Sequence, residues 1–184
     1  MSRAATWLER VAIALASVAL SLGLIAALSG FFAGRDQANL GAVAGPPGQA
    51  FRDQGDARLT PGAPRPAYDS SPPTSGAHFP VPVLRDESRL SDDQLLEALA
   101  RGDVVVLYPG PRAPPELEAL ARSLAAPFSP ALAAAGQAVI LAPFPGSTEL
   151  TALAWAHLLR ATSAGDPALR QFVEYWLGRG AGMA

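Results

Sequence analysis

The sequence predicts an α/β fold, with one N-terminal transmembrane helix, a flexible linker, and a small domain whose short, mainly parallel sheet is covered by helices. Residues 104–108 and 138–142 are continuous apolar runs, which are typical of strands buried on both faces. A helical pattern lies between them. Because strand–helix–strand units cross over in one direction, we expect these two strands to be parallel.

Residues 11–34 predict the transmembrane anchor, because they form an uncharged run long enough to cross a hydrocarbon core of ~30 Å. Arg3 and Arg10 precede the run, and this slight basic bias favours a cytoplasmic N-terminus at residues 1–10. We therefore expect a single-pass cell-membrane protein with an extracytoplasmic domain and the lipid bilayer as a partner. The alternatives are a signal peptide cleaved near residues 27–29 and a buried core helix.

Residues 35–66 are rich in Gly, Pro, Ala, Arg and Asp and show little apolar periodicity, which predicts a flexible linker. The extracytoplasmic domain is then expected at residues 67–180. Prolines alternate with apolar residues at 79–83, which predicts an edge strand or an extended arm. The chain has no cysteine, which excludes disulfides and thiolate chemistry. Its formal net charge of −2 gives no reason to expect a nucleic-acid partner.

Ser91 and Gln94 form a predicted capping box at the start of a helix that ends at Gly102. Further helical segments are expected at residues 114–124, 130–136, 149–162 and 166–177. The segment 149–162 is apolar nearly all round, and His157 lies on its apolar face. A lone histidine in such a place is more often a hydrogen-bonded core residue than a ligand.

Residues 68–79 are the most distinctive stretch of the chain. Two prolines hold the backbone extended, and Gly76 permits a positive φ, so the stretch predicts a tight turn that fixes the position of His78. Two interpretations remain open. The turn is either a structural turn with a surface histidine or a device that presents His78 to a ligand or metal.

The chain resembles a bacterial family of membrane-anchored proteins grouped as domain of unknown function 3105. The likeness covers about residues 65–180 and depends most on a Pro-Pro-Thr-Ser-Gly-x-His motif. The motif residues matched are Tyr68, Pro72, Pro73, Thr74, Ser75, Gly76, His78 and Trp155. The resemblance implies one N-terminal membrane helix and one external domain.

The family's His-x-Leu-Glu-His-Gly segment aligns with residues 97–102, where Glu97 and Arg101 replace the two histidines. In the family, three histidines and a glutamate would make a credible metal or acid–base site. Here only His78 stands at a matched position, so the resemblance implies a diverged member. Glu97 and Arg101 are four residues apart on one predicted helix, which predicts a surface ion pair.

We expect the domain to bind an envelope protein or a small ligand without catalysis and without a cofactor. The alternative is a metal-dependent enzyme or metal carrier, in which His78, Glu97 and His157 hold a divalent metal ion. A serine hydrolase is disfavoured because no Gly-x-Ser-x-Gly motif occurs. Ligands of open parallel sheets bind beyond the strand C-termini, here residues 108–112 and 143–147.

Overall fold

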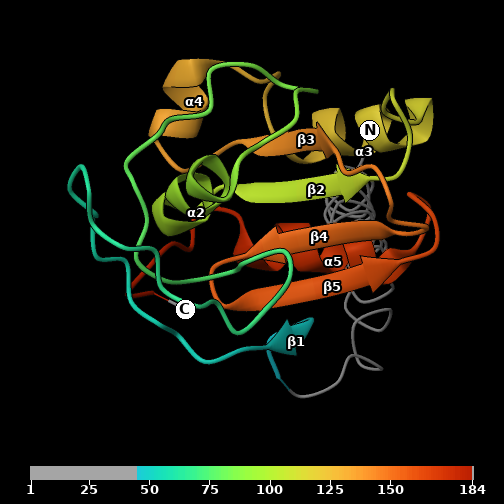
Figure 1. Ribbon diagram of the computed structural model, residues 1–184. Helices are drawn as coiled ribbons and strands as arrows, with labels where there is room; N and C mark the ends of the chain where they lie inside the picture. The colour runs from blue at the N-terminus through green and yellow to red at the C-terminus, as the bar shows by residue number, and fades with distance from the viewer. Residues whose placement is uncertain (1–44, 184) are drawn as a thin grey trace, which may run out of the picture. The chain divides into compact units, whose positions relative to one another are not determined.

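The computed structural model describes residues 45–183, of which those from Pro46 onward form one compact unit (Figure 1). The elements in chain order are β1 (Gln49–Ala50), α2 (Asp92–Arg101), β2 (Val104–Tyr108), α3 (Pro115–Leu124), α4 (Pro130–Ala134), β3 (Val139–Pro143), β4 (Leu150–Ala154), β5 (His157–Ala161) and α5 (Pro167–Trp176).

The five strands form one mixed sheet in the order β1-β5-β4-β2-β3. β2 and β3 are parallel, as the strand–helix–strand pattern predicts, and Val104 is in register with Val139. The other three pairings, β1–β5, β4–β5 and β2–β4, are antiparallel. The prediction of a mainly parallel sheet is therefore wrong, because two of the strands come from a segment expected to be helical.

The segment 149–162 is a β-hairpin instead of a helix. β4 and β5 pair from Leu150 with Ala161 to Ala154 with His157, and Trp155 and Ala156 form the connection. Ala156 has a φ of 57°, a left-handed conformation that Gly or Asn usually supplies in such hairpins. The sequence lacks that turn signal. A run that is apolar on all sides also fits a strand buried on both faces, and all five residues of β4 are buried.

Helices cover both faces of the sheet, and the two faces have separate hydrophobic cores. α3 and α5 pack on one face, against side chains such as Val106, Leu141 and Ala152. α2 and α4 cover the other face, against Val105 and Ile140. Alternate residues of the same strands thus serve opposite cores, which explains why β2 reads as a continuous apolar run.

The predicted start and end of α2 are confirmed. The Ser91 side chain accepts a hydrogen bond from the Gln94 backbone N–H, and the Gln94 side chain accepts one from the Ser91 N–H. Gly102 ends the helix with a φ of 112°. The helix is therefore held in a fixed register, which decides where Glu97 and Arg101 point.

Part of the expected linker belongs to the domain. β1 pairs with β5 as an edge strand, and Arg58 forms a parallel β-bridge with His78. The flexible linker is therefore wrong for the described residues 45–66, because backbone pairing and side-chain contacts hold them against the sheet and α2.

The predicted anchor at residues 11–34 lies outside the described residues. Within residues 45–183, none of the helices has the length and apolar character needed to cross a membrane.

Candidate functional site

Residues 68–78, called the signature segment below, lie on the face of the sheet that α2 covers. The Tyr68 hydroxyl donates a hydrogen bond to the Ala77 carbonyl at 3.0 Å. The Thr74 carbonyl accepts one from the Ala156 N–H at 2.9 Å, which ties the segment to the β4–β5 turn. Gly76 has a φ of 125°, as the turn chemistry predicts. The segment is therefore a fixed part of the fold.

His78 is buried at the end of this segment, with only 1% of its surface exposed. Its Nδ1 lies 2.8 Å from the Gly76 carbonyl oxygen, so Nδ1 carries a proton and donates it to that bond. Its Nε2 lies 3.2 Å from Oε2 of Glu97 on α2. The interpretation of a surface histidine is therefore wrong, because the ring is buried and contacts α2 through Glu97.

Glu97 is the centre of an ion cluster, which we call the Glu97 cluster and which consists of Arg58, His78, Glu97 and Arg101. His78 and Glu97 are buried, whereas the two arginines are partly exposed. The Glu97 side chain is 2% exposed. Its Oε1 accepts hydrogen bonds from Arg101 Nε at 2.9 Å and Nη2 at 2.5 Å, and from Arg58 Nη2 at 3.2 Å. The predicted pairing with Arg101 is present, but it is not a surface pair because the carboxylate is buried.

Asp93, one helical turn before Glu97, holds the preceding part of the chain in the same way. Arg65 donates two hydrogen bonds to its carboxylate, at 2.7 and 2.5 Å, and the Phe79 N–H donates a third at 3.1 Å. The Arg65 hydrogen bonds lower the pKa of the Asp93 carboxyl, and its burial opposes that effect. Two carboxylates of α2 therefore clamp the chain on either side of the signature segment.

His157 lies on β5, and its ring stacks on Trp176 of α5 with the centroids 3.9 Å apart. Trp176 belongs to the core on the face of the sheet that α3 and α5 cover. Trp155 belongs to the core on the α2 face, and its ring centroid lies 6.4 Å from that of His78. The structure therefore brings His78 and Glu97 together and leaves His157 on the opposite face. Within the described residues, no group of three His, Cys, Asp or Glu side chains is arranged to hold a metal ion.

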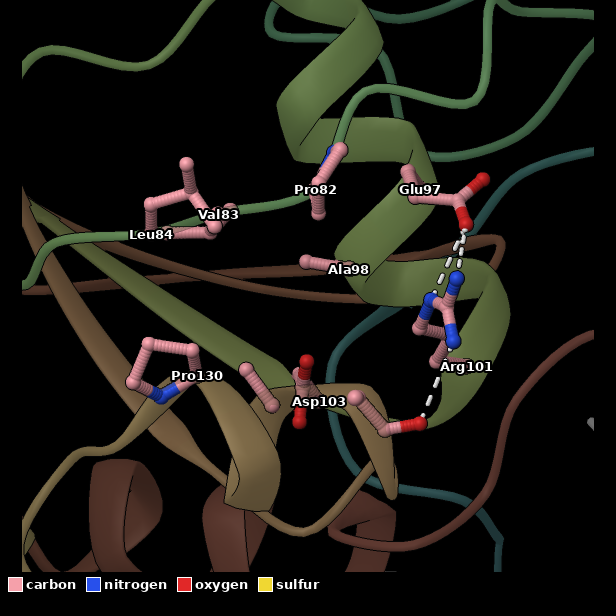
Figure 2. A pocket seen from close by; sticks show the side chains of 10 residues that line it. Pro82, Val83, Leu84, Glu97, Ala98, Arg101, Asp103 and Pro130 are labelled. Atoms are coloured by element: carbon pink, nitrogen blue, oxygen red, sulfur yellow. Dashed lines mark hydrogen bonds and ion pairs between the residues drawn. The ribbon is translucent and has the colours of Figure 1, made fainter.

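A small pocket, called the α2–α4 pocket below, lies beside the Glu97 cluster and has a volume of about 50 Å³. Figure 2 shows the Asp103 carboxylate beneath Ala98, with Arg101 on one side and Pro130 on the other. Apart from charged groups, its walls are apolar. The lining residues are Pro82, Val83, Leu84, Glu97, Ala98, Arg101, Asp103, Pro130, Ala133 and Ala134.

Asp103 is the unusual group in this pocket. It is 1% exposed, and its Oδ1 accepts a hydrogen bond from the Ala138 N–H at 2.8 Å. Its Oδ2 is buried and has no hydrogen-bond partner among residues 45–183. Burial raises the pKa of the Asp103 carboxyl to about 7, against the opposing effects of the Ala138 N–H and the Arg101 charge. A buried acceptor without a partner is costly, so it marks a place where a donor would be stabilising.

A second, larger pocket of about 260 Å³ lies at the loop after β3. Its lining includes Phe144, Gly146 and Ser147, which lie in the segment 143–147 where the sequence predicts ligand binding beyond a strand C-terminus. Ser71 and Pro72 of the signature segment also line it. Its polar lining also includes Arg160 of β5, which is exposed. None of the polar atoms left buried without a hydrogen-bond partner within residues 45–183 belongs to its lining.

Sequence reasoning missed Arg58, Arg65 and Asp103. The two arginines lie in a Gly- and Pro-rich segment whose composition resembles a linker, so nothing local marks them as partners of α2. Asp103 did carry a signal, because it stands between the helix-ending Gly102 and a fully buried strand. A carboxylate in that position has little chance of reaching solvent.

The fold and the site define a small mixed α/β domain in which two carboxylates of one helix clamp a Pro-Pro-Thr-Ser-Gly-x-His segment. The model of the family described as Protein of unknown function (DUF3105) matches residues 63–182, and the chain belongs to this family. A search of curated proteins and a search of solved structures each found no match to the chain.

Proposed function

We propose that this domain is a non-enzymatic binding module, which takes up a small ligand in the α2–α4 pocket. The observation that carries the proposal is Asp103, which lines this pocket and whose buried Oδ2 has no hydrogen-bond partner in the described part of the chain. The pocket walls are otherwise mostly apolar. A few convergent polar groups in an apolar cleft are typical of small-ligand sites.

The Glu97 cluster supports a structural role for the residues of the signature segment. Glu97 Oε1 already accepts bonds from two arginines, and Glu97 Oε2 lies against His78. A general acid or base needs a free atom within hydrogen-bond reach of a substrate. The cluster instead neutralises a buried carboxylate and fixes Arg101, whose third hydrogen bond goes to the Ala134 carbonyl at 3.1 Å on the pocket rim.

A ligand screen by NMR on the full chain tests this proposal, with Ala134→Met as the blocking variant. Ala134 is an exposed residue at the end of α4 and lines the pocket, so a longer side chain there fills the mouth without entering the core. We expect at least one small molecule to bind saturably to the wild type and to be excluded by Ala134→Met. Binding that is unaffected by this variant, or hydrolytic turnover that depends on His78, would contradict the proposal.

The proposal places the domain outside the cytoplasm, anchored in the cell membrane by residues 11–34. The length of that uncharged run and the basic residues Arg3 and Arg10 before it support this arrangement. Alkaline extraction of membranes, followed by protease treatment of intact cells, tests it. We expect the chain to stay with the membrane and its domain to be cleaved from outside; a chain released by alkali contradicts the anchor.

A divalent-metal site at His78 and Glu97 is the second candidate. One observation favours it: Nδ1 of His78 donates to a backbone carbonyl, as in many metal-bound histidines, and Nε2 faces Glu97 Oε2. Arg58 and Arg101 oppose it, because two guanidinium groups beside Glu97 repel a cation. The test is titration with Co²⁺ followed by visible absorbance. A 1:1 spectrum that disappears in His78→Ala supports a metal, and an unchanged spectrum without coordination bands excludes it.

A further inference from the structure

We propose that the ligand of the α2–α4 pocket is a primary ammonium group on a short alkyl chain, held by Asp103 Oδ2. This inference rests on the proposed function and names the chemistry of its ligand. The group that selects the ligand is the buried carboxylate at the pocket floor, whose Oδ2 is unpartnered within residues 45–183. An ammonium group supplies both the missing hydrogen-bond donor and a compensating positive charge.

The size and lining of the pocket limit the ligand to a few atoms with an apolar body. A volume of about 50 Å³ has room for only a few water-sized groups. Val83, Ala98 and Ala133 present apolar surface to an alkyl chain. The chain has no lysine, so it contains no side-chain primary ammonium of its own.

The charges around Asp103 favour a cation over an anion. Only Glu97 and Arg101, both on α2, are charged among the other residues that line the pocket; α4 and residues 82–84 contribute Pro, Ala, Val and Leu. Arg101 makes two hydrogen bonds to Glu97, so these two charges offset each other among the lining residues, while Arg58 binds the same carboxylate from outside the pocket lining. The remaining charge is that of Asp103. Because burial raises its pKa to about 7, ammonium binding is expected to strengthen as pH rises through that value.

The ammonium group has two possible sources, a free small amine or the lysine side chain of another protein. Both present the same chemistry at the floor of the pocket. They differ at the mouth, where a lysine continues into a backbone that must pass Ala134 and Leu84.

The experiment is an NMR titration of the full chain at pH 8.5 and constant ionic strength. The probes are ethylammonium, ethanol and acetate, which are similar in size and differ in charge. We expect ethylammonium to shift the backbone amides of Ala98, Asp103 and Ala133 saturably. Its dissociation constant is expected in the millimolar range, since three non-hydrogen atoms rarely bind more tightly. The affinity is expected to fall at least tenfold at pH 5.5.

Asp103→Asn is the decisive variant, because it removes the charge and keeps an acceptor for the Ala138 N–H. We expect at least a tenfold loss of ethylammonium affinity. Asp86→Asn is the matched control: Asp86 likewise accepts a backbone N–H of β3, from Leu141 at 2.8 Å, and does not line this pocket. Its affinity for ethylammonium is expected to be unchanged. An equal loss in both variants overturns the proposal.

Ethanol or acetate binding at these amides without ethylammonium overturns the ammonium inference and leaves the binding module standing. If none of the three probes shifts these amides, the inference fails, and the broader ligand screen then decides the proposed function. A further arm uses Nα-acetyl-lysine amide. Binding of this probe at the same amides indicates a lysine of another protein as the source, whereas its exclusion alongside ethylammonium binding indicates a free amine.

Discussion

Nε2 of His78 lies 3.2 Å from Oε2 of Glu97, and both side chains are almost completely excluded from solvent. This contact joins the last residue of the signature segment to the second turn of α2. Since Nδ1 of His78 donates to Gly76, the contact with Glu97 needs a proton between Nε2 and Oε2. Arg58 and Arg101 bind the other oxygen of Glu97, so one carboxylate orders three segments of the chain.

Glu97→Gln is expected to destabilise the domain by roughly 2–4 kcal/mol, because it leaves His78, Arg58 and Arg101 around an uncharged amide. The measurement is urea unfolding. Glu118→Gln is the matched control, since Glu118 pairs with Arg122 at the same helical spacing but in a more exposed position. Its effect is expected to stay below about 1 kcal/mol. Equal effects of the two substitutions would show that the Glu97 cluster is not a hub.

Gly76→Ala is expected to destabilise the domain by more than its backbone conformation alone accounts for. A Cβ at Gly76 would lie 2.9 Å from Cε1 of Tyr68, in addition to the strain of a φ of 125°. Gly62→Ala isolates the second effect, because Gly62 also has a positive φ, of 86°, and open space around it. Urea unfolding should give a difference of at least about 1 kcal/mol between the two variants, from overpacking. Equal losses of stability in Gly76→Ala and Gly62→Ala would show that the Tyr68 ring does not pack against Gly76.

Ala156→Gly distinguishes the hairpin from the helix that the sequence favours. In a helix this substitution costs about 1 kcal/mol. In the β4–β5 turn, where Ala156 has a φ of 57°, glycine relieves left-handed strain and is expected to leave the stability unchanged or raise it. Ala156→Val, with a branched side chain at the same φ, is expected to destabilise strongly. Thermal unfolding of the two variants measures both effects, and a loss of about 1 kcal/mol for glycine would favour the helix.

Asp103 should make the domain less stable as the pH rises. Its carboxyl pKa is about 7 when folded and ordinarily 3.8, so between these values the folded chain holds a proton that the unfolded chain has released. The free energy of unfolding therefore falls through this window. Between pH 5 and pH 8 the loss is roughly 2–3 kcal/mol in the wild type, and Asp103→Asn removes it. Urea unfolding of the wild type and of Asp103→Asn at both pH values measures this loss. If the variant loses as much stability as the wild type, the raised pKa of the Asp103 carboxyl is contradicted.

Local signals in the sequence predicted the elements that they govern. The Ser91–Gln94 capping box and Gly102 define α2, and the β-branched run at residues 104–108 forms β2. The parallel pairing of β2 with β3 followed from the helix between them. These features depend on a few neighbouring residues, which is why one sequence is enough to predict them.

The hairpin and the Glu97 cluster depend on contacts distant in the sequence. Alanine and leucine favour a helix at residues 149–162, and the β4 pairing with β2 outweighs that propensity. Glu97 and Arg101 show the spacing of a surface pair, and only the approach of Arg58 and His78 buries the carboxylate. The motif located His78 correctly, but its partner on α2 could be proposed only from the family resemblance.

Metal content of the full chain as purified tests the central claim most directly, that Glu97 is held by arginines and His78 and forms a structural cluster. It is measured by mass spectrometry for the wild type and for Glu97→Gln. The account predicts far less than one metal ion per chain in both proteins. Close to one ion per wild-type chain, lost in Glu97→Gln, would contradict it and make the His78–Glu97 contact a metal site.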